Sequence, residues 1–495
     1  MNPPRATART WWGLAALLLP ALLTSMDVSI LFLAGPTLAE SLRMSPTQWL
    51  WTMDIYGLVM AGLLITMGNL GDRFGRRRLL IIGAAIFGAA SLLLALAPNA
   101  ETLILGRGIL AVGGATLAPS TLSLIRDMFT DAHQRRLALG AWTIAFTGGA
   151  VGGPIIGGQL LEHLWWGSVF LINAPAMLLL LILVPLLVPE STPRRGTRVD
   201  VAGALSSLVA IISLSALLKT LIGPTLGIAT LITFVVALGA GWYFLARQGR
   251  SPDPLINPQW FRERSFSAGI GANAMIAAIT GGIGVLVFPY LQTVHGLSPF
   301  WAALCGLPPM IGSMLGATAA TRLARHRPIA PLIVTGLLVA AAGTALLAFT
   351  ATHGSLVGFL AGYTVLIFGC SGIAPLANSL VLAHPPPDRV GAAAGISESS
   401  NQLGTSLGIV SFGTLATLVY RHDLRDALGT ESSGAERSLA DAVNLARALP
   451  EQQAQALLDQ ASTAYSSGLT VATLVAGALL ALVAAAWIGW RRRRA

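Results

Sequence analysis

The 495-residue sequence is poor in charge, in cysteine and in lysine, and each shortage excludes a class of protein. Charged residues make up 11% of the chain, whereas soluble domains carry about 25%. The two cysteines, Cys305 and Cys370, stand apart in apolar segments, which supports neither a disulfide framework nor a zinc site. The single lysine, Lys219, excludes a phosphate-binding loop that ends in Gly-Lys-Ser/Thr. We therefore expect no metal and no cofactor, and any energy for work must come from an ion or substrate gradient or from a partner.

Long hydrophobic runs are what the sequence has instead, since 54% of its residues are hydrophobic. A helix needs about twenty apolar residues to cross the hydrocarbon core of a bilayer. The first run is too long for a signal peptide, and we expect it to be retained as a span. Fourteen runs meet the length, which predicts an all-α integral membrane protein with spans at 12–36, 48–70, 79–97, 102–124, 137–160, 166–189, 200–219, 227–246, 265–291, 299–320, 329–349, 356–383, 391–419 and 465–490.

The basic residues orient these spans. With a cytoplasmic N-terminus, 24 of the 31 basic residues fall in cytoplasmic segments, six fall outside and Arg107 falls within a span. This bias follows the positive-inside rule and predicts that both termini are cytoplasmic. Because the arginines are scattered between apolar runs and form no contiguous face, the net charge of +10 does not indicate binding to nucleic acid.

The chain is expected to divide into two bundles with an insertion between them. The loops after spans two and ten are both rich in arginine, a weak repeat that sets spans 1–6 against spans 9–14. We predict a six-helix bundle over residues 1–189, two inserted central helices with a cytoplasmic linker over 190–264, and a second six-helix bundle over 265–495.

The outside segment over residues 421–464 is the longest polar connection. It carries amphipathic patterns over 439–448 and 451–465, which indicate short helical pieces. Two interpretations stay open, a solvated loop and a lid over an external vestibule.

Four charged residues stand out inside the predicted spans, where a charge costs several kcal/mol and is a candidate for function. Helical rise places Asp27, Asp54 and Arg107 about 8–10 Å from the outer surface, and Glu398 about 12 Å from the cytoplasmic surface. A carboxyl group held there can titrate when a cation competes with a proton, as a coupling site requires. The alternatives are a structural ion pair for Asp27 and Arg107, a water-exposed position for Asp54, and a helix-end hydrogen bond for Glu398.

The fifth span has a run of glycines. Gly149, Gly153 and Gly157 recur every four residues and give a flat face for close helix packing, and Pro154 removes a backbone hydrogen bond and bends the helix. The bend beside this face favours a seam that moves, although packing alone would also explain the glycines.

Two patterns of soluble enzymes also occur. Residues 404–408 fit a nucleophile elbow and residues 269–274 fit a dinucleotide-loop variant. Both need a strand–turn–helix context, which an apolar helix does not supply, so we do not expect an enzyme.

Several motifs together resemble the major facilitator superfamily. The sequence is similar throughout to its fourteen-span drug:proton antiporters, the multidrug and quaternary-ammonium efflux pumps of bacteria. The motifs that carry this resemblance are the loop Gly68–Arg78, the span-4 segment Leu105–Gly108, the span-5 segment Gly149–Gly158, the pair Met26-Asp27, and the acidic positions Asp54 in span 2 and Glu398 in span 13.

The resemblance implies roles for particular residues. In the family, the loop carboxylate and the arginines after it hold the two bundles together on the cytoplasmic side, a role that falls here on Asp72, Arg73 and Arg76. The antiporter motif implies that the span-5 glycines and Pro154 take part in the conformational change.

These observations lead to a proton-coupled multidrug efflux transporter that exports lipophilic cations by alternating access. Protons and drug would compete at Asp27, Asp54 and Glu398, with Arg107 beside them. Residues of aromatic or soft character would line the cavity, unless they only pack against neighbouring helices: Tyr56, Met60, Trp142, Phe146, Phe288 and Tyr290. We expect a monomer in the bacterial inner membrane, in contact with membrane lipid. The alternatives are an exporter of one antibiotic or lipid-like metabolite, a nutrient importer, and a non-transporting receptor or scaffold.

Overall fold

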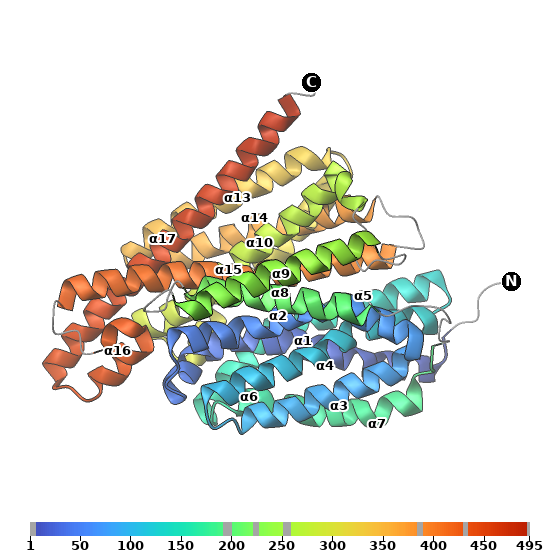
Figure 1. Ribbon diagram of the computed structural model, residues 1–495, viewed down its shortest axis with the longest axis horizontal. Helices are drawn as coiled ribbons and strands as arrows, with labels where there is room; N and C mark the ends of the chain where they lie inside the picture. Colours follow the sequence, from blue (N-terminus) through green and yellow to red (C-terminus); the bar gives the residue numbers. More distant parts are fainter. Residues whose placement is uncertain are drawn as a thin grey trace. The chain divides into compact units, whose positions relative to one another are not determined.

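A computed structural model describes residues 6–191, 200–220, 227–250, 259–383, 390–428 and 434–492, and every regular element in these ranges is helical (Figure 1). Fourteen helices or helix pairs in this part of the chain are long and apolar enough to cross a membrane, one for each predicted span. The elements are α1 (Ala8–Ser41), α2 (Pro46–Phe74), α3 (Arg76–Ala95), α4 (Ala100–Met128), α5 (Ala132–His163), α6 (Ser168–Leu171), α7 (Asn173–Leu187), α8 (Val201–Lys219), α9 (Ile228–Arg250), η2 (Trp260–Arg262), α10 (Arg264–Pro289), η3 (Tyr290–Val294), α11 (Pro299–Leu304), α12 (Leu307–Leu323), α13 (Ile329–Thr352), α14 (Leu356–Leu382), α15 (Val390–Leu428), η5 (Ala435–Arg437), α16 (Leu439–Ala446) and α17 (Glu451–Arg492).

Three predicted spans consist of two consecutive elements. The sixth is α6 with α7, the ninth is α10 with the π-helical turn η3, and the tenth is α11 with α12. The tenth breaks at Cys305 and Gly306, and Pro308 then stands in the first turn of α12, where a missing N–H costs no helical hydrogen bond. Local backbone conformation therefore determines where these spans break, and hydrophobic length alone does not predict the breaks.

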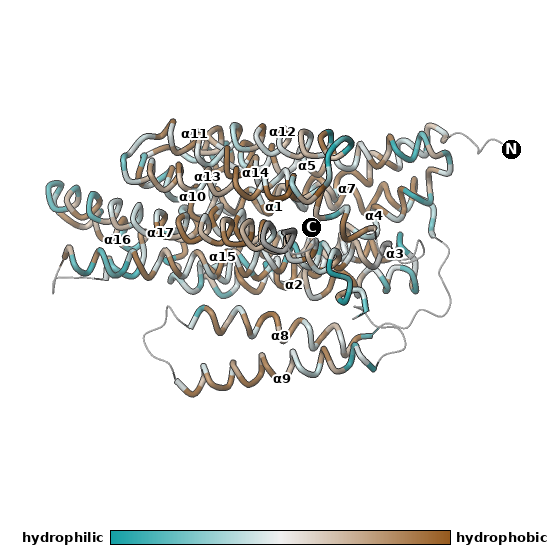
Figure 2. The backbone as a smooth tube through the Cα atoms, turned by 90° about the horizontal axis from the view of Figure 1, so that it is seen from above, coloured by the Kyte–Doolittle hydropathy of each residue, from teal (hydrophilic) through white to brown (hydrophobic). Residues whose placement is uncertain are grey.

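The chain divides into two compact units. Unit 1 comprises residues 1–37, 51–214 and 234–256. Within it, α3 packs against α4 and α7. The ends of the adjacent helices α8 and α9 are joined by an ion pair of 2.7 Å between Asp200 Oδ1 and Arg247 Nε. In the most apolar stretch of α9 no residue is buried, and this surface is hydrophobic (Figure 2), as a helix surrounded by lipid requires.

Unit 2 comprises residues 38–50, 215–233 and 257–495. Its helices pack chiefly as the pairs α13 with α14, α10 with α15, α12 with α14 and α13 with α17. Glycines allow the α10–α15 contact, because a Cβ atom at Gly404 or Gly408 would lie 2.2 or 2.0 Å from a carbonyl oxygen of α10. The segment that fits a nucleophile elbow is thus a packing face inside a helix.

The polar segment before the last span folds into a helical cluster with its own apolar core. The end of α15, η5, α16 and the start of α17 enclose buried side chains, and Tyr420 donates a hydrogen bond of 3.1 Å from its hydroxyl to the carbonyl of Ala435. The predicted helix over 439–448 is α16, whereas the pattern over 451–465 is the first part of the 42-residue helix α17. The described part of this segment is therefore packed structure, and a lid function stays a hypothesis.

Candidate functional site

Asp27 and Arg107 form a buried ion pair in unit 1. Asp27 lies in α1 and Arg107 in α4, and their exposed fractions are 3% and 1%. The guanidinium Nη1 donates directly to the carboxylate Oδ2. Depth along the predicted spans placed both residues at the same level, and the structure brings them into contact. A pair so deprived of water is stable only while both charges are present.

Tyr56 of α2 covers this pair. Its ring lies over the guanidinium, with 4.8 Å between the ring centroid and Cζ of Arg107, and the side chain is 3% exposed. A Cβ atom at Gly114 would lie 2.6 Å from the Tyr56 hydroxyl and 3.3 Å from Sδ of Met60, so glycine leaves the space that both side chains fill. Tyr56 thus packs over Arg107, and the buried Met60 packs near Gly114 farther along α4.

Asp54 lies two residues before Tyr56 on the same helix. Its exposed fraction is 0%. The following residue, Ile55, approaches α4, where its Cγ1 is 3.8 Å from the position that a Cβ atom of Gly108 would take. The α2 turn that carries Asp54 therefore lies against the α4 turn that carries Arg107.

The fifth span packs tightly on the first through its glycines. A Cβ atom at Gly149 would lie 2.1 Å from the carbonyl oxygen of Leu22, and one at Gly153 would lie 2.3 Å from the hydroxyl of Ser29. At the same crossing the Ser25 hydroxyl donates a hydrogen bond of 2.6 Å to the carbonyl of Phe146.

Farther along the same face, a Cβ atom at Gly157 would lie 3.1 Å from the side chain of Ile30. Pro154 is buried within α5, which runs on to His163. These contacts show the packing role of the repeat, and movement along the seam stays a prediction.

The junction between α2 and α3 carries Asp72, Arg73 and Arg76, for which the family resemblance implies a role in conformational gating. Arg76 donates to Asp72 Oδ1 from Nε at 3.0 Å and from Nη2 at 2.6 Å. The Arg73 guanidinium lies over the Phe74 ring at 5.3 Å. Gly75 joins the two helices with φ of 104°, a left-handed conformation that favours glycine.

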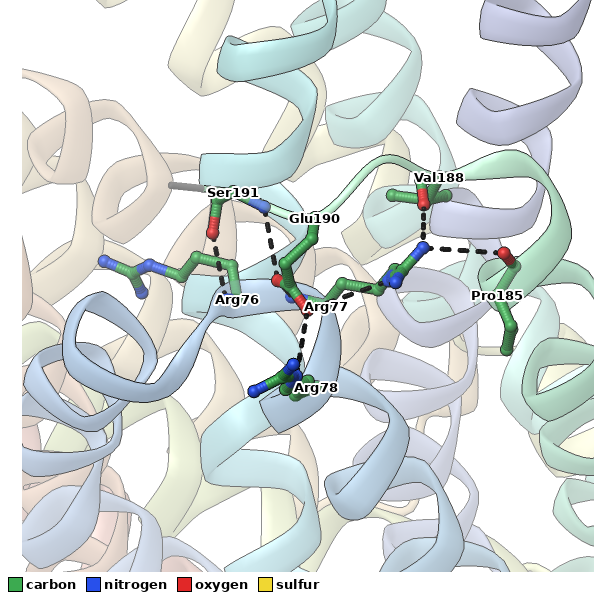
Figure 3. A network of polar contacts seen from close by, with 7 residues as sticks. All are labelled: Arg76, Arg77, Arg78, Pro185, Val188, Glu190 and Ser191. Carbon is green, nitrogen blue, oxygen red and sulfur yellow. Dashed lines mark hydrogen bonds and ion pairs between the residues drawn. The ribbon is translucent and has the colours of Figure 1, made fainter. Parts of the chain in front are cut away.

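Glu190 and Ser191, which follow α7, cap the start of α3 (Figure 3). The backbone N–H of Arg77 donates to Glu190 Oε1 at 2.9 Å, and that of Arg76 donates to the Ser191 hydroxyl at 3.0 Å. Glu190 Oε2 also lies 3.7 Å from Nε of Arg77 and 3.8 Å from Nε of Arg78. The carboxylate satisfies a free helix-terminal donor and offsets the arginine charges, which ties the loop to the end of the sixth span.

Sequence reasoning missed Glu190. The available signal was its position: it follows the sixth span on the side where the arginine-rich loop is expected, and it is acidic. Charge complementarity between two segments on one side of the membrane would have drawn attention to it.

Glu398 belongs to unit 2, where it is exposed on α15. Gln402 donates a hydrogen bond of 3.0 Å from Nε2 to its Oε1. At the preceding position, the Ser397 hydroxyl donates to Asn378 Oδ1 at 2.7 Å, and Asn273 Nδ2 donates to Asn378 Oδ1 at 2.9 Å and to the Ser397 oxygen at 2.8 Å. An exposed carboxylate beside this polar network is available to a cation.

The aromatic candidates fall into two kinds. Trp142 and Phe146 stack with centroids 5.5 Å apart, the Trp142 Nε1 donates to the Thr121 hydroxyl at 3.2 Å, and Phe146 is 40% exposed. In unit 2, Phe288 is half-buried, whereas Tyr290 is fully buried and stacks on Phe359 at 4.4 Å. The first pair presents an open aromatic surface, and Tyr290 packs against its neighbours.

In the described ranges, no three His, Cys, Asp or Glu side chains are placed to share an ion. Cys305 and Cys370 are unpaired thiols there.

Fourteen helices of the described residues are long and apolar enough to cross a membrane, and unit 1 buries a charged pair, as expected for a multi-pass membrane transporter. The model of the Major Facilitator Superfamily matches residues 17–409, and the chain belongs to this superfamily. It is therefore a transporter and not an enzyme, and the receptor or scaffold alternative is set aside.

Two similar proteins are a bacterial efflux pump and a bacterial resistance protein. The chain is 40% identical to the multidrug efflux pump LfrA of Mycolicibacterium smegmatis, over 99% of this chain and 98% of that protein. It is 36% identical to the methyl viologen resistance protein SmvA of Salmonella typhimurium, over 96% of this chain and 97% of that protein. Among solved structures, the inward-facing bacterial homologue of the human lysosomal transporter Spinster has the same fold, with a TM-score of 0.68 at 18% identity and coverage of 98% and 97%.

Proposed function

We propose that this protein is a proton-coupled exporter of lipophilic, mostly monocationic compounds, working by alternating access in the bacterial plasma membrane with both termini in the cytoplasm. The observation that carries the proposal is the buried ion pair of Asp27 and Arg107, which joins the apolar helices α1 and α4. The similarity to proteins named for multidrug efflux and methyl viologen resistance supports export of cationic drugs.

The pair acts as the coupling site because its carboxylate can be neutralised in two ways. Either a proton binds Asp27, or a substrate cation draws it away from Arg107. The two cannot hold the same carboxylate at once, so uptake of a proton from outside releases the drug, and release of the proton to the cytoplasm readies the site again. Each unit of pH difference supplies about 1.4 kcal/mol per proton.

The substrate surface is proposed to combine flat aromatic rings with carboxylates. Trp142 and Phe146 offer an open stacked pair, and an aromatic face attracts an organic cation by about 0.5–2 kcal/mol. Asp54 adds a buried carboxylate on α2 in unit 1, and we propose Glu398, on α15 of unit 2, as a separate exposed carboxylate that attracts cations. A site that recognises charge and apolar surface, and few directed hydrogen bonds, accepts many different drugs.

We propose that alternating access involves two bundles and two mobile contacts. Residues 1–189 and 265–495 form the two bundles, and the seam of α5 against α1 and the loop of Asp72, Arg73 and Arg76 change between states. The hydrogen bond from the Arg77 backbone N–H to Glu190 holds the start of α3 against the segment that follows α7 within the first bundle.

Dye transport into everted membrane vesicles tests the proposal. Vesicles with wild-type protein should accumulate ethidium when their lumen is acidified, and a protonophore should abolish the accumulation. Asp27→Asn should remove it with the protein still in the membrane, whereas the matched neutralisation Glu162→Gln, on the exposed end of α5, should leave it intact. Dye movement that ignores the proton gradient contradicts proton coupling, and movement in the opposite direction supports uptake instead.

A further inference from the structure

Arg107 has few partners for a charge so deeply buried. It is 1% exposed, and within the described residues its Nε has no hydrogen-bond partner. Its two identified contacts are the ion pair with Asp27 and the ring of Tyr56. The guanidinium keeps its proton under all conditions of transport. Any event that neutralises Asp27 therefore leaves a full positive charge in an apolar interior.

The contact between the Tyr56 ring and Arg107 contributes most to stability when Asp27 is neutralised. While Asp27 is ionised, the pair is neutral as a whole and the ring faces a compensated charge. Once Asp27 takes a proton from the external water, the guanidinium loses its ion pair with Asp27, and attraction between a cation and an aromatic face is strongest where water is excluded. The ring thus stabilises the protonated state of the site more than the ionised state.

The other charged groups on the described helices around this site are few. On α2, Asp54 is buried two residues from Tyr56, whereas Asp72 and Arg73 lie in the last turn of the helix. On α5, which packs against α1, the charged side chains are confined to the end turns over 133–136 and 162–163. On α3, which packs against α4, they stand at the start over 76–78. Asp27, Arg107, Tyr56 and Asp54 are accordingly the groups that determine the protonation of this site.

We propose that Tyr56 is a positioning residue of the coupling site, whose ring holds the Arg107 charge whenever Asp27 is protonated, and that it does not contact the drug. This inference rests on the proposed competition between a proton and a cation at Asp27. It replaces the expectation that Tyr56 lines the substrate cavity, since the side chain is 3% exposed and lies against Arg107.

The ring and not the hydroxyl carries this role, and Gly114 keeps the ring in place. Phenylalanine has the same aromatic face, so Tyr56→Phe preserves the contact, whereas Tyr56→Leu removes it. Gly114→Ala would put a methyl group 2.6 Å from the Tyr56 hydroxyl and push the ring from its position. With phenylalanine at position 56 the nearest atoms are 3.3 Å away, so the double variant relieves the crowding.

Binding of ethidium to the purified full-length protein, followed by fluorescence anisotropy across pH, tests the inference. In wild type the apparent Kd should rise as the pH falls, because protons compete for Asp27. Tyr56→Leu should move the midpoint of this rise about one pH unit lower, which is a tenfold weaker affinity for the proton, or about 1.4 kcal/mol. Tyr56→Phe should keep both the wild-type midpoint and the wild-type affinity for ethidium at alkaline pH.

Gly114→Ala provides an independent arm that leaves the tyrosine in the chain. It should lower the midpoint, and Gly114→Ala with Tyr56→Phe should restore it. Weaker binding by Tyr56→Leu at every pH with an unchanged midpoint would show that Tyr56 contacts the drug, which overturns the inference. So would a Gly114→Ala midpoint equal to that of wild type. If wild-type binding does not depend on pH at all, the proposed proton coupling itself fails.

Discussion

Adding one methyl group to α5 at Gly149 should damage the protein, whereas adding it one residue earlier should not. At Gly149 the Cβ atom would meet the carbonyl oxygen of Leu22 at 2.1 Å and the hydroxyl of Ser25 at 2.2 Å. The carbonyl is backbone and cannot rotate away, so α1 and α5 must separate by roughly 1 Å at this crossing. At Gly148 nothing lies within 4 Å of the added atom.

The two substitutions share the same intrinsic helix term, which favours alanine over glycine by about 1 kcal/mol. Overpacking costs about 1–3 kcal/mol, and separation of the helices also breaks the hydrogen bond from Ser25 to the Phe146 carbonyl. Gly149→Ala should therefore be less stable than Gly148→Ala by about 1–3 kcal/mol.

Thermal unfolding in detergent measures this difference, and ethidium transport in vesicles measures its consequence. We expect a lower Tm and slow transport for Gly149→Ala, with wild-type behaviour for Gly148→Ala. Equal melting temperatures and equal transport rates for the two variants would refute the tight crossing of α1 and α5.

The remaining predictions concern the charged groups. Asp27→Asn alone leaves the Arg107 charge buried without its counter-charge and should lower the free energy of unfolding by about 3–5 kcal/mol. The double variant Asp27→Asn with Arg107→Gln should restore most of that loss. No recovery in the double variant would contradict the pairing. Glu398→Gln should lower resistance to cationic dyes several-fold and leave resistance to neutral compounds unchanged in growth assays, and an equal loss for both would count against its role. Glu190→Gln weakens the cap on α3 and the contact with Arg77 and should lower stability by about 0.3–1 kcal/mol, read as a Tm decrease that the exposed control Glu162→Gln lacks.

The fold was predictable because a bilayer imposes two strong constraints. Hydrophobic length fixed the spans, and the arginine distribution is consistent with each predicted crossing. The same arithmetic of helical rise predicted that Asp27 and Arg107 lie at one depth, which the ion pair confirms. The sequence did not reveal that α17 begins at Glu451, since a polar segment that keeps helical periodicity can continue straight into a span.

The finer parts of the site were not predictable, because depth along a helix does not define which way a side chain faces. The ring of Tyr56 lies over the Arg107 guanidinium, a contact that depth along the helix did not predict. Tyr290 is similar in kind and is fully buried against Phe359. The hydrogen bond between Arg77 and Glu190 joins segments more than a hundred residues apart, and a single sequence does not predict such a contact.

Proton release during drug binding is the most direct test of the central claim, that a proton and a cation compete for Asp27. Ethidium is added to purified protein in a weakly buffered solution whose pH lies below the midpoint at which protons weaken ethidium binding, and released protons are counted with a pH-sensitive dye. Wild type should release protons in proportion to bound ethidium, and Asp27→Asn should release far fewer. Saturating binding to wild type without any change in bound protons would contradict the account.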